Sequence, residues 1–285
     1  MIWQTKEWSE MLRNTKQVDK IIKFKECSIE KRSLGMGQYG LFILGYSSVF
    51  SLKNLEKLKE ICRKENSLFI QYETNDYSQN IHKTKNDFSE GHYKKFITPY
   101  TAVIDLSLDI DTILANMKPK GRYNIKLTAK KGVITKIVKK NQKNISDFFD
   151  LMTETTSRDS FSGNTFDYYN LFLETINDSE LILAYKDGVA IAGGIFIFTK
   201  EVAIYYYGAS SSKKEYRNLM APYGVQYLAI QEAKKRGSKI YDFLGIATPD
   251  EKDSELSGVT EFKLKLSKDT RNVSQSFIWI NKRFH

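Results

Sequence analysis

The amino-acid sequence predicts an α/β (α+β) protein made of two domains in tandem. At 285 residues the chain is longer than one ordinary domain and is about right for two. Helical and strand-like periodicities alternate along its whole length, with only four prolines and no low-complexity stretch. A hydrophobic content of 41% with 27% charged residues is typical of a folded globular chain.

Secretion, membrane insertion and disulfide scaffolding are not indicated. No segment reaches the roughly 18 consecutive apolar residues of a spanning helix, and the most apolar run, residues 191–198, contains a Gly-Gly pair typical of a strand. The first residues lack the apolar core of a signal peptide. Two cysteines, Cys27 and Cys62, imply no disulfide framework. We therefore expect a soluble cytoplasmic monomer.

The first half of the chain predicts four helices and four strands. Its clearest helix spans residues 52–64, where Leu55, Leu58 and Cys62 share one apolar stripe. Gly132 suits the left-handed position that follows a helix. The other predicted elements are helices near 8–12, 109–117 and 121–131 and strands 21–29, 40–45, 67–73 and 100–106.

In the second half of the chain the order of helices and strands is easier to predict. It predicts helices 145–156 and 166–176, strands 181–185, 189–198 and 202–207, helix 220–235, strand 239–244, a polar loop 245–258 and a last strand 277–280. The turn Lys186-Asp187-Gly188 marks the first two strands as a hairpin, because Asp-Gly supplies the positive φ angles that such turns need. Helix, helix, three-strand meander, helix, strand is the order of a GNAT-type acyltransferase domain. The first half fits a degraded version of this order, so we predict two GNAT-like domains packed together, with a boundary near 138–145.

Nucleotide and metal chemistry are disfavoured by context. Residues 35–40 match the pattern Gly-x-Gly-x-x-Gly, but a strand-like run follows where a dinucleotide site needs a helix, so a hairpin turn is favoured. His82, His92 and His285 lack the spacing of metal ligands. Cys62 is interpreted as a packing residue. We expect catalysis without a metal or a covalent intermediate.

The segment Arg217-Asn218-Leu219-Met220-Ala221-Pro222 stands where an acetyl-CoA enzyme of this fold needs a glycine-rich turn. Backbone N–H groups of such a turn, with a helix N-terminus, hold the pyrophosphate. Side chains at these positions obstruct a close approach, and Pro222 lacks an N–H group. The sequence therefore predicts acyl transfer from a carrier other than CoA.

Residues 118–143 contain ten Lys or Arg and no Asp or Glu, which equals the net charge of +10 of the whole chain. A basic surface of this kind attracts polyanions. A solvated helix face is the alternative interpretation, but such faces usually mix charges of both signs. A phosphate-bearing ligand is therefore favoured.

Several motifs in chain order resemble the Fem aminoacyltransferases, which build the interpeptide bridge of peptidoglycan from aminoacyl-tRNA. The resemblance runs over nearly the whole chain. The motifs are Gln4-Thr5-x-x-Trp8, Phe69-Ile70-x-x-Glu73, Lys120-x-Arg122-Tyr123-Asn124-Ile125-x-x-x-Ala129-Lys130-Lys131-Gly132-Val133, Tyr205-Tyr206-Tyr207-Gly208-Ala209-Ser210, Tyr216-Arg217-x-x-x-Ala221-Pro222-Tyr223-x-x-Gln226, Tyr241-Asp242-Phe243-x-Gly245-Ile246 and Gly258-Val259-x-x-Phe262-Lys263.

The resemblance implies two GNAT-like domains whose last strand returns to the first, giving residues 1–140 with 272–285 as domain one and 141–271 as domain two. It implies a site for a lipid-linked or UDP-linked muropeptide. Phe262 and Lys263 match the family's Phe-Lys pair, in which the lysine steadies the transferring carbonyl. Arg158 resembles the arginine that holds the precursor diphosphate, and Tyr207 resembles a tyrosine near it. Tyr216, Tyr223, Gln226 and Glu73 are further candidate substrate-binding residues.

The chain also departs from the family's pattern. It is too short for the coiled-coil arm of the longer members, and Glu10 and Leu12 occupy the likely positions of a second diphosphate-binding lysine. Leu264-Lys265-Leu266-Ser267 follows the Phe-Lys pair, where glycine-rich residues are common in the family.

We predict that the reaction is aminolysis of an aminoacyl ester by an amine of a peptidoglycan precursor. Lys263 would stabilise the tetrahedral oxyanion, and Asp242 is either the general base or a structural residue of the following loop. Aminoacyl-tRNA would be the co-substrate, with no other cofactor. The predicted tRNA-binding residues are Lys118, Lys120, Arg122, Lys126, Lys130 and Lys131. The alternatives are an N-acyltransferase acting on an amine outside peptidoglycan, a non-catalytic RNA-binding protein on the same scaffold and an acetyl-CoA enzyme.

Overall fold

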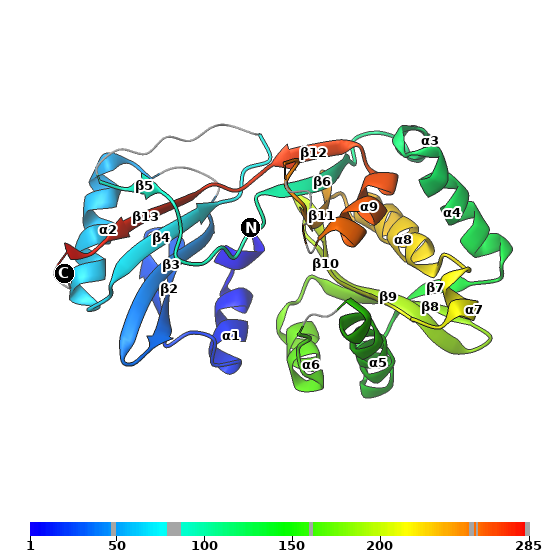
Figure 1. The fold of residues 1–285 in the computed structure, drawn as a ribbon, viewed down its shortest axis with the longest axis horizontal. Coiled ribbons are helices and arrows are strands. Elements are labelled where there is room, and N and C mark those ends of the chain that lie inside the picture. The colour runs from blue at the N-terminus through cyan, green and yellow to red at the C-terminus, as the bar shows by residue number, and fades with distance from the viewer. Residues whose placement is uncertain (47–49, 79–86, 160–161, 251–253, 255, 283–285) are drawn as a thin grey trace. The chain divides into compact units, whose positions relative to one another are not determined.

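The structure of the protein is a computed structural model that describes residues 1–46, 50–78, 87–159, 162–250, 254 and 256–282. The chain divides into two compact units, each with its own β-sheet (Figure 1). The first unit is Met1–Tyr100 with Arg271–His285, and the second is Thr101–Thr270. The predicted α/β class with two units is confirmed.

The first unit has a six-stranded sheet in the order β1-β2-β3-β4-β13-β5. Its strands are β1 (Lys20–Phe24), β2 (Cys27–Gly35), β3 (Gln38–Tyr46), β4 (Phe69–Thr74), β5 (Ser89–Glu90) and β13 (Ser276–Ile280). The 3-10 turn η1 (Ile2–Gln4) and helices α1 (Lys6–Asn14) and α2 (Leu52–Lys64) accompany it. The apolar stripe of α2 lies in the core, where Leu55, Leu58 and Cys62 are buried against the sheet.

Two features of this unit differ from or refine the sequence prediction. The single strand expected over 21–29 is a hairpin, because Lys25 turns the chain at φ 52° between β1 and β2. The glycine pattern of residues 35–40 forms the turn between β2 and β3, with Gly35 at φ 93° and Gly37 at φ 72°. Both segments are antiparallel connections, and no helix follows the glycines.

The second unit has a seven-stranded sheet in the order β12-β6-β11-β10-β9-β8-β7. Its strands are β6 (Tyr100–Asp105), β7 (Ile134–Val138), β8 (Ser179–Lys186), β9 (Val189–Phe198), β10 (Val202–Ser210), β11 (Ile240–Ile246) and β12 (Asp269–Asn272). Its helices are α3 (Ile110–Asn116), α4 (Pro119–Lys130), α5 (Gln142–Asp159), α6 (Phe166–Thr175), α7 (Lys214–Arg217), α8 (Ala221–Lys235) and α9 (Ser257–Leu266).

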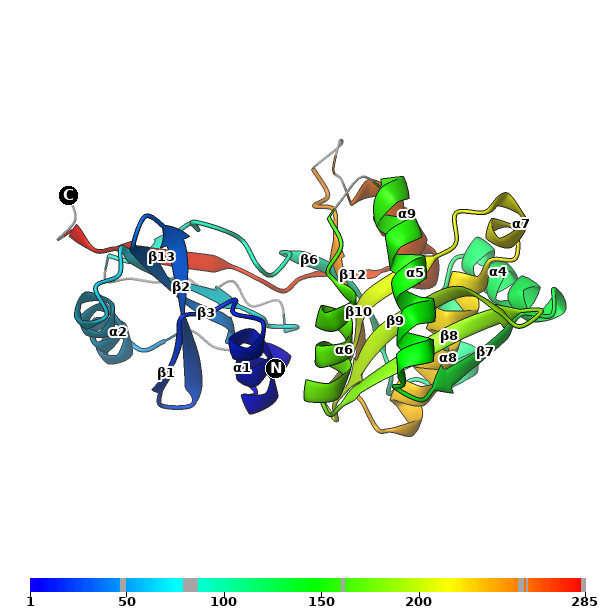
Figure 2. The ribbon, with the colours of Figure 1, turned by 90° about the horizontal axis from the view of Figure 1, so that it is seen from below.

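Helices cover both faces of the second sheet. Helices α5 and α6 lie on one face and α8 lies on the other, with α4 and α9 beside it (Figures 1 and 2). The predicted Asp-Gly turn connects β8 and β9, with Asp187 at φ 50° and Gly188 at φ 81°. The parallel pair of β10 and β11 is bridged by α8 and puts the carboxyl ends of both strands at one edge, where polar side chains gather.

The predicted domain boundary near residue 140 is wrong. Residues 101–140 belong to the second unit, because β6 inserts into its sheet beside β11 and β7 pairs with β8. These pairings are non-local, so no local pattern in the sequence marks them. The final part of the predicted polar loop 245–258 is the start of α9, and residues 251–253 and 255 of that loop lie outside the described residues. Within the described segments, no helix is long and apolar enough to cross a membrane.

Candidate functional site

Lys263 is a buried lysine on α9 in the second unit. Its residue is 6% exposed, and its Nζ donates hydrogen bonds to the carbonyl oxygens of Gly245, at 2.7 Å, and Leu244, at 3.3 Å. Burial lowers the pKa of Lys263 to about 8, and the negative charge of Asp242 opposes this shift. The side chain therefore carries its positive charge at neutral pH in a site largely shielded from water.

Asp242 lies within β11, where it is the last residue that pairs with β10, and it is 1% exposed. Its Oδ1 accepts a hydrogen bond from the backbone N–H of Leu244 at 2.7 Å and a short one from the hydroxyl of Thr101. Leu244 has φ 54°, in the left-handed region. The carboxylate therefore holds a bend of β11 at Leu244, called the turn from here on, whose carbonyl groups contact Lys263.

The aromatic ring of Tyr205 lies near this lysine. Its Nζ lies 5.9 Å from the ring centroid of Tyr205, within cation–π range. Tyr241 donates to Oε1 of the buried Gln226 at 2.5 Å, and a hydrogen bond with Gln226 partly offsets the burial that raises the pKa of Tyr205 to about 12. Only glycine fits at position 208, because a Cβ there would lie 1.5 Å from the Tyr205 hydroxyl.

Phe262 and Tyr223 contact each other beside this group. Their rings are edge to face, with centroids 5.0 Å apart. Tyr223 is buried on α8, one turn from Gln226, so α8 contributes both residues to the surroundings of α9. The structure thus brings together five of the predicted site residues, namely Lys263, Phe262, Asp242, Tyr223 and Gln226.

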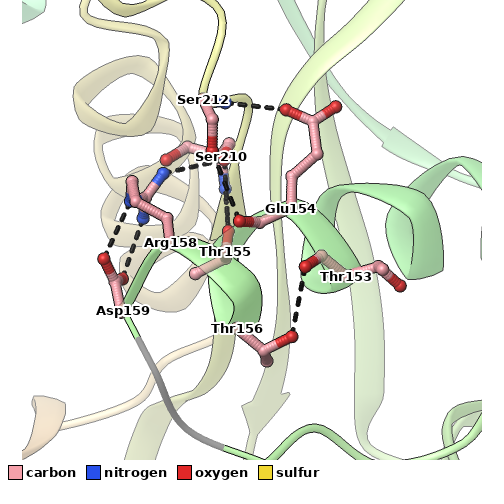
Figure 3. A network of polar contacts seen from close by, with 8 residues as sticks. All are labelled: Thr153, Glu154, Thr155, Thr156, Arg158, Asp159, Ser210 and Ser212. Atoms are coloured by element: carbon pink, nitrogen blue, oxygen red, sulfur yellow. Dashed lines mark hydrogen bonds and ion pairs between the residues drawn. The ribbon is translucent and has the colours of Figure 1, made fainter.

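Arg158 lies at the carboxyl end of α5, against the end of β10 (Figure 3). Its Nε and Nη2 bind the two carboxylate oxygens of Asp159 at 2.8 and 2.9 Å, and its Nη1 donates to the carbonyl of Ser210 at 3.2 Å. The fork that could hold a phosphate is therefore occupied by a carboxylate of the same helix. The side chain of Arg158 is 28% exposed, so an anion can reach it.

Hydrogen bonds fix the end of α5 to the end of β10 (Figure 3). Thr155 exchanges hydrogen bonds with the backbone N–H and C=O of Ser210, at 3.0 and 3.1 Å. Glu154 accepts from the hydroxyl of Ser211 at 2.8 Å and the N–H of Ser212 at 2.7 Å. The end of α5 that carries Arg158 is therefore joined to the end of β10 by several hydrogen bonds.

Tyr207 belongs to an aromatic cluster between β10 and α6. Its hydroxyl lies 3.0 Å from that of Tyr168, and its ring contacts those of Tyr169 and Phe172. Burial is the main cause that raises its pKa well above the ordinary value. Tyr207 is thus anchored to α6, while Tyr216 lies half-exposed on the short helix α7.

The segment before α8 carries bulky side chains and a proline. Met220 takes a left-handed conformation with φ 56° at the position before the helix, and Pro222 occupies its first turn. The carbonyl of Met220 accepts from the hydroxyl of Thr128 on α4 at 2.8 Å. Helix α4 therefore lies against the N-terminal end of α8, where the fold would otherwise offer backbone N–H groups.

Five of the six predicted tRNA-binding residues are exposed on and around α4: Lys118, Lys120, Lys126, Lys130 and Lys131. In the part of the chain that the structure describes, none of these five forms an ion pair. Arg122 differs, because its guanidinium donates to the carbonyls of Ala115 and Met117 and caps the preceding helix α3.

Helix α4 is placed directly against α9. A Cβ at Gly121 would lie 2.1 Å from the carbonyl oxygen of Lys265, so only glycine allows this approach. The backbone N–H of Lys118 donates to the same carbonyl at 3.1 Å. The basic helix and the helix of Lys263 are therefore neighbours within one unit.

Glu73 belongs to the first unit, whereas Lys263 belongs to the second. It is fully buried in β4 and accepts hydrogen bonds from Gln71 and from the backbone N–H groups of Phe96 and Ile97, at 2.7 to 3.2 Å. Burial raises its pKa. In this structure the carboxylate fixes the segment before β6. Among the described residues no group of three or more His, Cys, Asp or Glu could hold a metal ion.

The chain was compared with models of known protein families. The model of the FemAB family matches residues 87–185 and 177–279, which is more than half of the chain. The chain belongs to the FemAB family.

Relatives of this FemAB chain carry a consistent description. A lipid II:glycine glycyltransferase of Staphylococcus haemolyticus (strain JCSC1435) is 23% identical over 78% of this chain and 71% of its own length. A protein of the same name from Staphylococcus aureus is 24% identical over the same shares.

Solved structures support the same fold for this FemAB chain. FemX has a TM-score of 0.82 at 17% identity and covers 99% of this chain and 93% of its own. The C-terminal domain of a putative lysylphosphatidylglycerol synthetase from Agrobacterium fabrum has a TM-score of 0.65 at 11% identity, covering 99% and 90%. At these identities the likeness concerns the fold.

Sequence reasoning missed three residues of the site in this FemAB chain. Thr101 approaches Asp242 from β6, 141 positions earlier in the sequence. Leu244 adopts its left-handed conformation although leucine gives no such signal, and Tyr205 contacts Lys263 from inside a run of three tyrosines. The one usable signal was Gly208, since a glycine within an otherwise bulky strand often marks a close approach.

Proposed function

We propose that this chain transfers an aminoacyl group from aminoacyl-tRNA to an amine of a lipid-linked peptidoglycan precursor. The observation that carries the proposal is the buried ammonium of Lys263, held by two carbonyl groups beside Phe262 in a member of the FemAB family. The similarity to lipid II:glycine glycyltransferases supports both the kind of group that is moved and the lipid-linked acceptor.

The reaction is an exchange of one acyl bond for another. The acceptor amine attacks the ester carbonyl, a C–N bond forms, and the bond to the ribose oxygen breaks. The amine loses a proton, and the ribose oxygen gains one. The ammonium of Lys263 stabilises the negative charge that develops on the carbonyl oxygen. Its burial makes this interaction stronger than it would be in water.

The donor is inferred from two features of α4 and α8. Five lysines around α4 are exposed and form no ion pair with another described residue, so they provide a surface for phosphates, and α4 adjoins the helix of Lys263. Pro222 lacks an N–H group, and the side chain of Met220 obstructs the close approach that a CoA pyrophosphate would need. Both features favour an RNA-linked acyl group over acetyl-CoA.

The diphosphate of the acceptor would bind to the guanidinium of Arg158. A guanidinium binds phosphate oxygens in a bidentate manner, and here its partner is the carboxylate of Asp159. A diphosphate would therefore have to replace Asp159. This exchange gives the acceptor site a specific test.

Arg158→Ala should raise the KM for a diphosphate-bearing acceptor about 10- to 100-fold, because a charge-assisted pair is lost. Asp159→Asn should lower this KM by a few-fold, since the competing carboxylate is weakened. Steady-state kinetics with lipid II and with the free stem peptide measures both. If the two acceptors respond alike in each variant, Arg158 does not bind the diphosphate.

The whole proposal is tested by incubating the purified chain with a mixed pool of charged tRNAs and with lipid-linked and UDP-linked muropeptides. Mass spectrometry of the acceptor should show the mass of one added amino acid, and RNase treatment of the pool should abolish it. An acetylated product formed from acetyl-CoA would contradict the proposed donor. A product only on amines outside peptidoglycan would contradict the acceptor, and RNA binding without any product would favour a non-catalytic role.

A further inference from the structure

The turn that follows Asp242 is held in an unfavourable backbone conformation. Leu244 has φ 54°, a region that costs a non-glycine residue about 1 kcal/mol or more. Such a conformation persists only where neighbouring groups fix it. Here its N–H group donates to Oδ1 of Asp242 at 2.7 Å.

Thr101 adds a second contact to the same turn from β6. It is 2% exposed, and its hydroxyl is within hydrogen-bond distance of Oδ1 of Asp242 and of the carbonyl oxygen of Leu244, the latter at 3.0 Å. A hydroxyl has one hydrogen to donate. The carboxylate is the stronger acceptor, so the Leu244 carbonyl remains available to Lys263.

The carbonyl groups of this turn are the acceptors that fix the lysine. Nζ of Lys263 donates to Gly245 at 2.7 Å and to Leu244 at 3.3 Å. The direction of both carbonyls depends on the left-handed conformation of Leu244. A chain of contacts therefore runs from Thr101 through Asp242 and the turn to the ammonium.

We propose that Thr101 and Asp242 are positioning residues, which orient the turn at Leu244 so that its carbonyls hold the ammonium of Lys263 in place for the reaction. This inference rests on the proposed function for its catalytic meaning. It gives Asp242 a role other than general base, since Oδ1 is already engaged by two donors and the residue is 1% exposed. Precise placement of a catalytic group is worth large factors in rate.

Thr101→Val tests the proposal, because valine keeps the shape of threonine and removes the hydroxyl. We expect kcat to fall about 10-fold or more while both KM values change less than about twofold, since positioning acts on the reacting state. The pKa of Lys263 should move below its value of about 8, because the ammonium loses acceptors with a fixed direction. Thr101→Ser keeps the hydroxyl and should restore both quantities.

The pKa of Lys263 can be followed by NMR of ¹³C-labelled lysine, with the resonance identified by its loss in Lys263→Met. An unchanged kcat with a lower melting temperature would make Thr101 merely structural and overturn the proposal. A loss of more than about 1,000-fold in Asp242→Asn, with no change in Thr101→Val, would identify Asp242 as the base instead.

The two hypotheses fail separately. If the wild-type chain transfers no aminoacyl group, the proposed function fails, yet the pKa of Lys263 in Thr101→Val still measures whether the turn fixes the ammonium. If the wild type is active and this pKa does not move, only the positioning role fails.

Discussion

Lys263→Met should lower kcat about 100- to 1,000-fold, the effect of removing one oxyanion donor from an active site. Methionine fills a similar volume and carries no charge. Lys265→Met is the matched control, because Lys265 lies on the same helix and pairs with Glu261 near the surface. A loss of similar size in Lys265→Met would show that α9 is merely sensitive to substitution.

The same substitution should not destabilise the fold at neutral pH. In the folded chain burial lowers the pKa of Lys263 from its ordinary value of 10.5 to about 8, so burial of the charge costs about 3 kcal/mol below pH 8. Loss of the hydrogen bond to Gly245 costs about 1–3 kcal/mol in the variant. The two effects nearly cancel, whereas a core residue kept for packing would cost more when replaced.

The pH dependence has a definite sign. Between pH 8 and 10.5 the unfolded chain binds a proton at Lys263 that the folded chain does not, so the wild type loses stability as pH falls through this window. Lys263→Met lacks this dependence, so its stability relative to that of the wild type should fall as pH rises from 8 to 10. Urea unfolding of both proteins at pH 7 and pH 10 measures the difference. The kcat ratio of wild type to variant should also fall above about pH 8, and a flat ratio would contradict the role of a charged lysine.

Charge reversal on α4 should have the second large effect. The variant combines three substitutions, Lys120→Glu, Lys126→Glu and Lys130→Glu. It should raise the KM for aminoacyl-tRNA by about 10-fold or more. The slope of the logarithm of the tRNA-binding constant against the logarithm of the salt concentration should become less steep by about 2 to 3, since each lost phosphate contact removes about 0.7–0.9 from it. Arg122 is left unchanged because it caps α3. Filter binding and steady-state kinetics at several salt concentrations give both values.

A control triple keeps the change in net charge equal. Lys200→Glu, Lys235→Glu and Lys239→Glu replace three exposed lysines of the same unit that lie outside α4. We expect them to change tRNA use by less than about threefold, because they lack a concentrated basic surface. Equal losses in both triples would show that overall charge attracts the tRNA, and unchanged use in the α4 triple would remove α4 from the tRNA site.

Local patterns in the sequence predicted many of the helices and hairpins, and two segments show the physical reasons. Helix α2 agrees with the predicted residues 52–64 because its apolar stripe has the helical period and Ser51 caps its start. The β8–β9 hairpin follows from Asp-Gly, which tolerates positive φ. Chemical motifs likewise singled out Lys263, Phe262 and the basic run, since charge and residue type are properties of the chain itself.

Only the tertiary structure decided the partners of those residues. Lys263 is a buried ammonium because its Nζ donates to the carbonyl groups of Gly245 and Leu244, which lie 18 and 19 residues earlier in the chain. The turn that carries these carbonyls is in contact with Asp242, which accepts a hydrogen bond from Thr101, a residue 141 positions earlier. The assignment of residues 101–140 to the second unit likewise came from non-local strand pairing. Local sequence sets propensity and charge, whereas burial, hydrogen-bond direction and pKa arise from contacts between segments that only folding brings together.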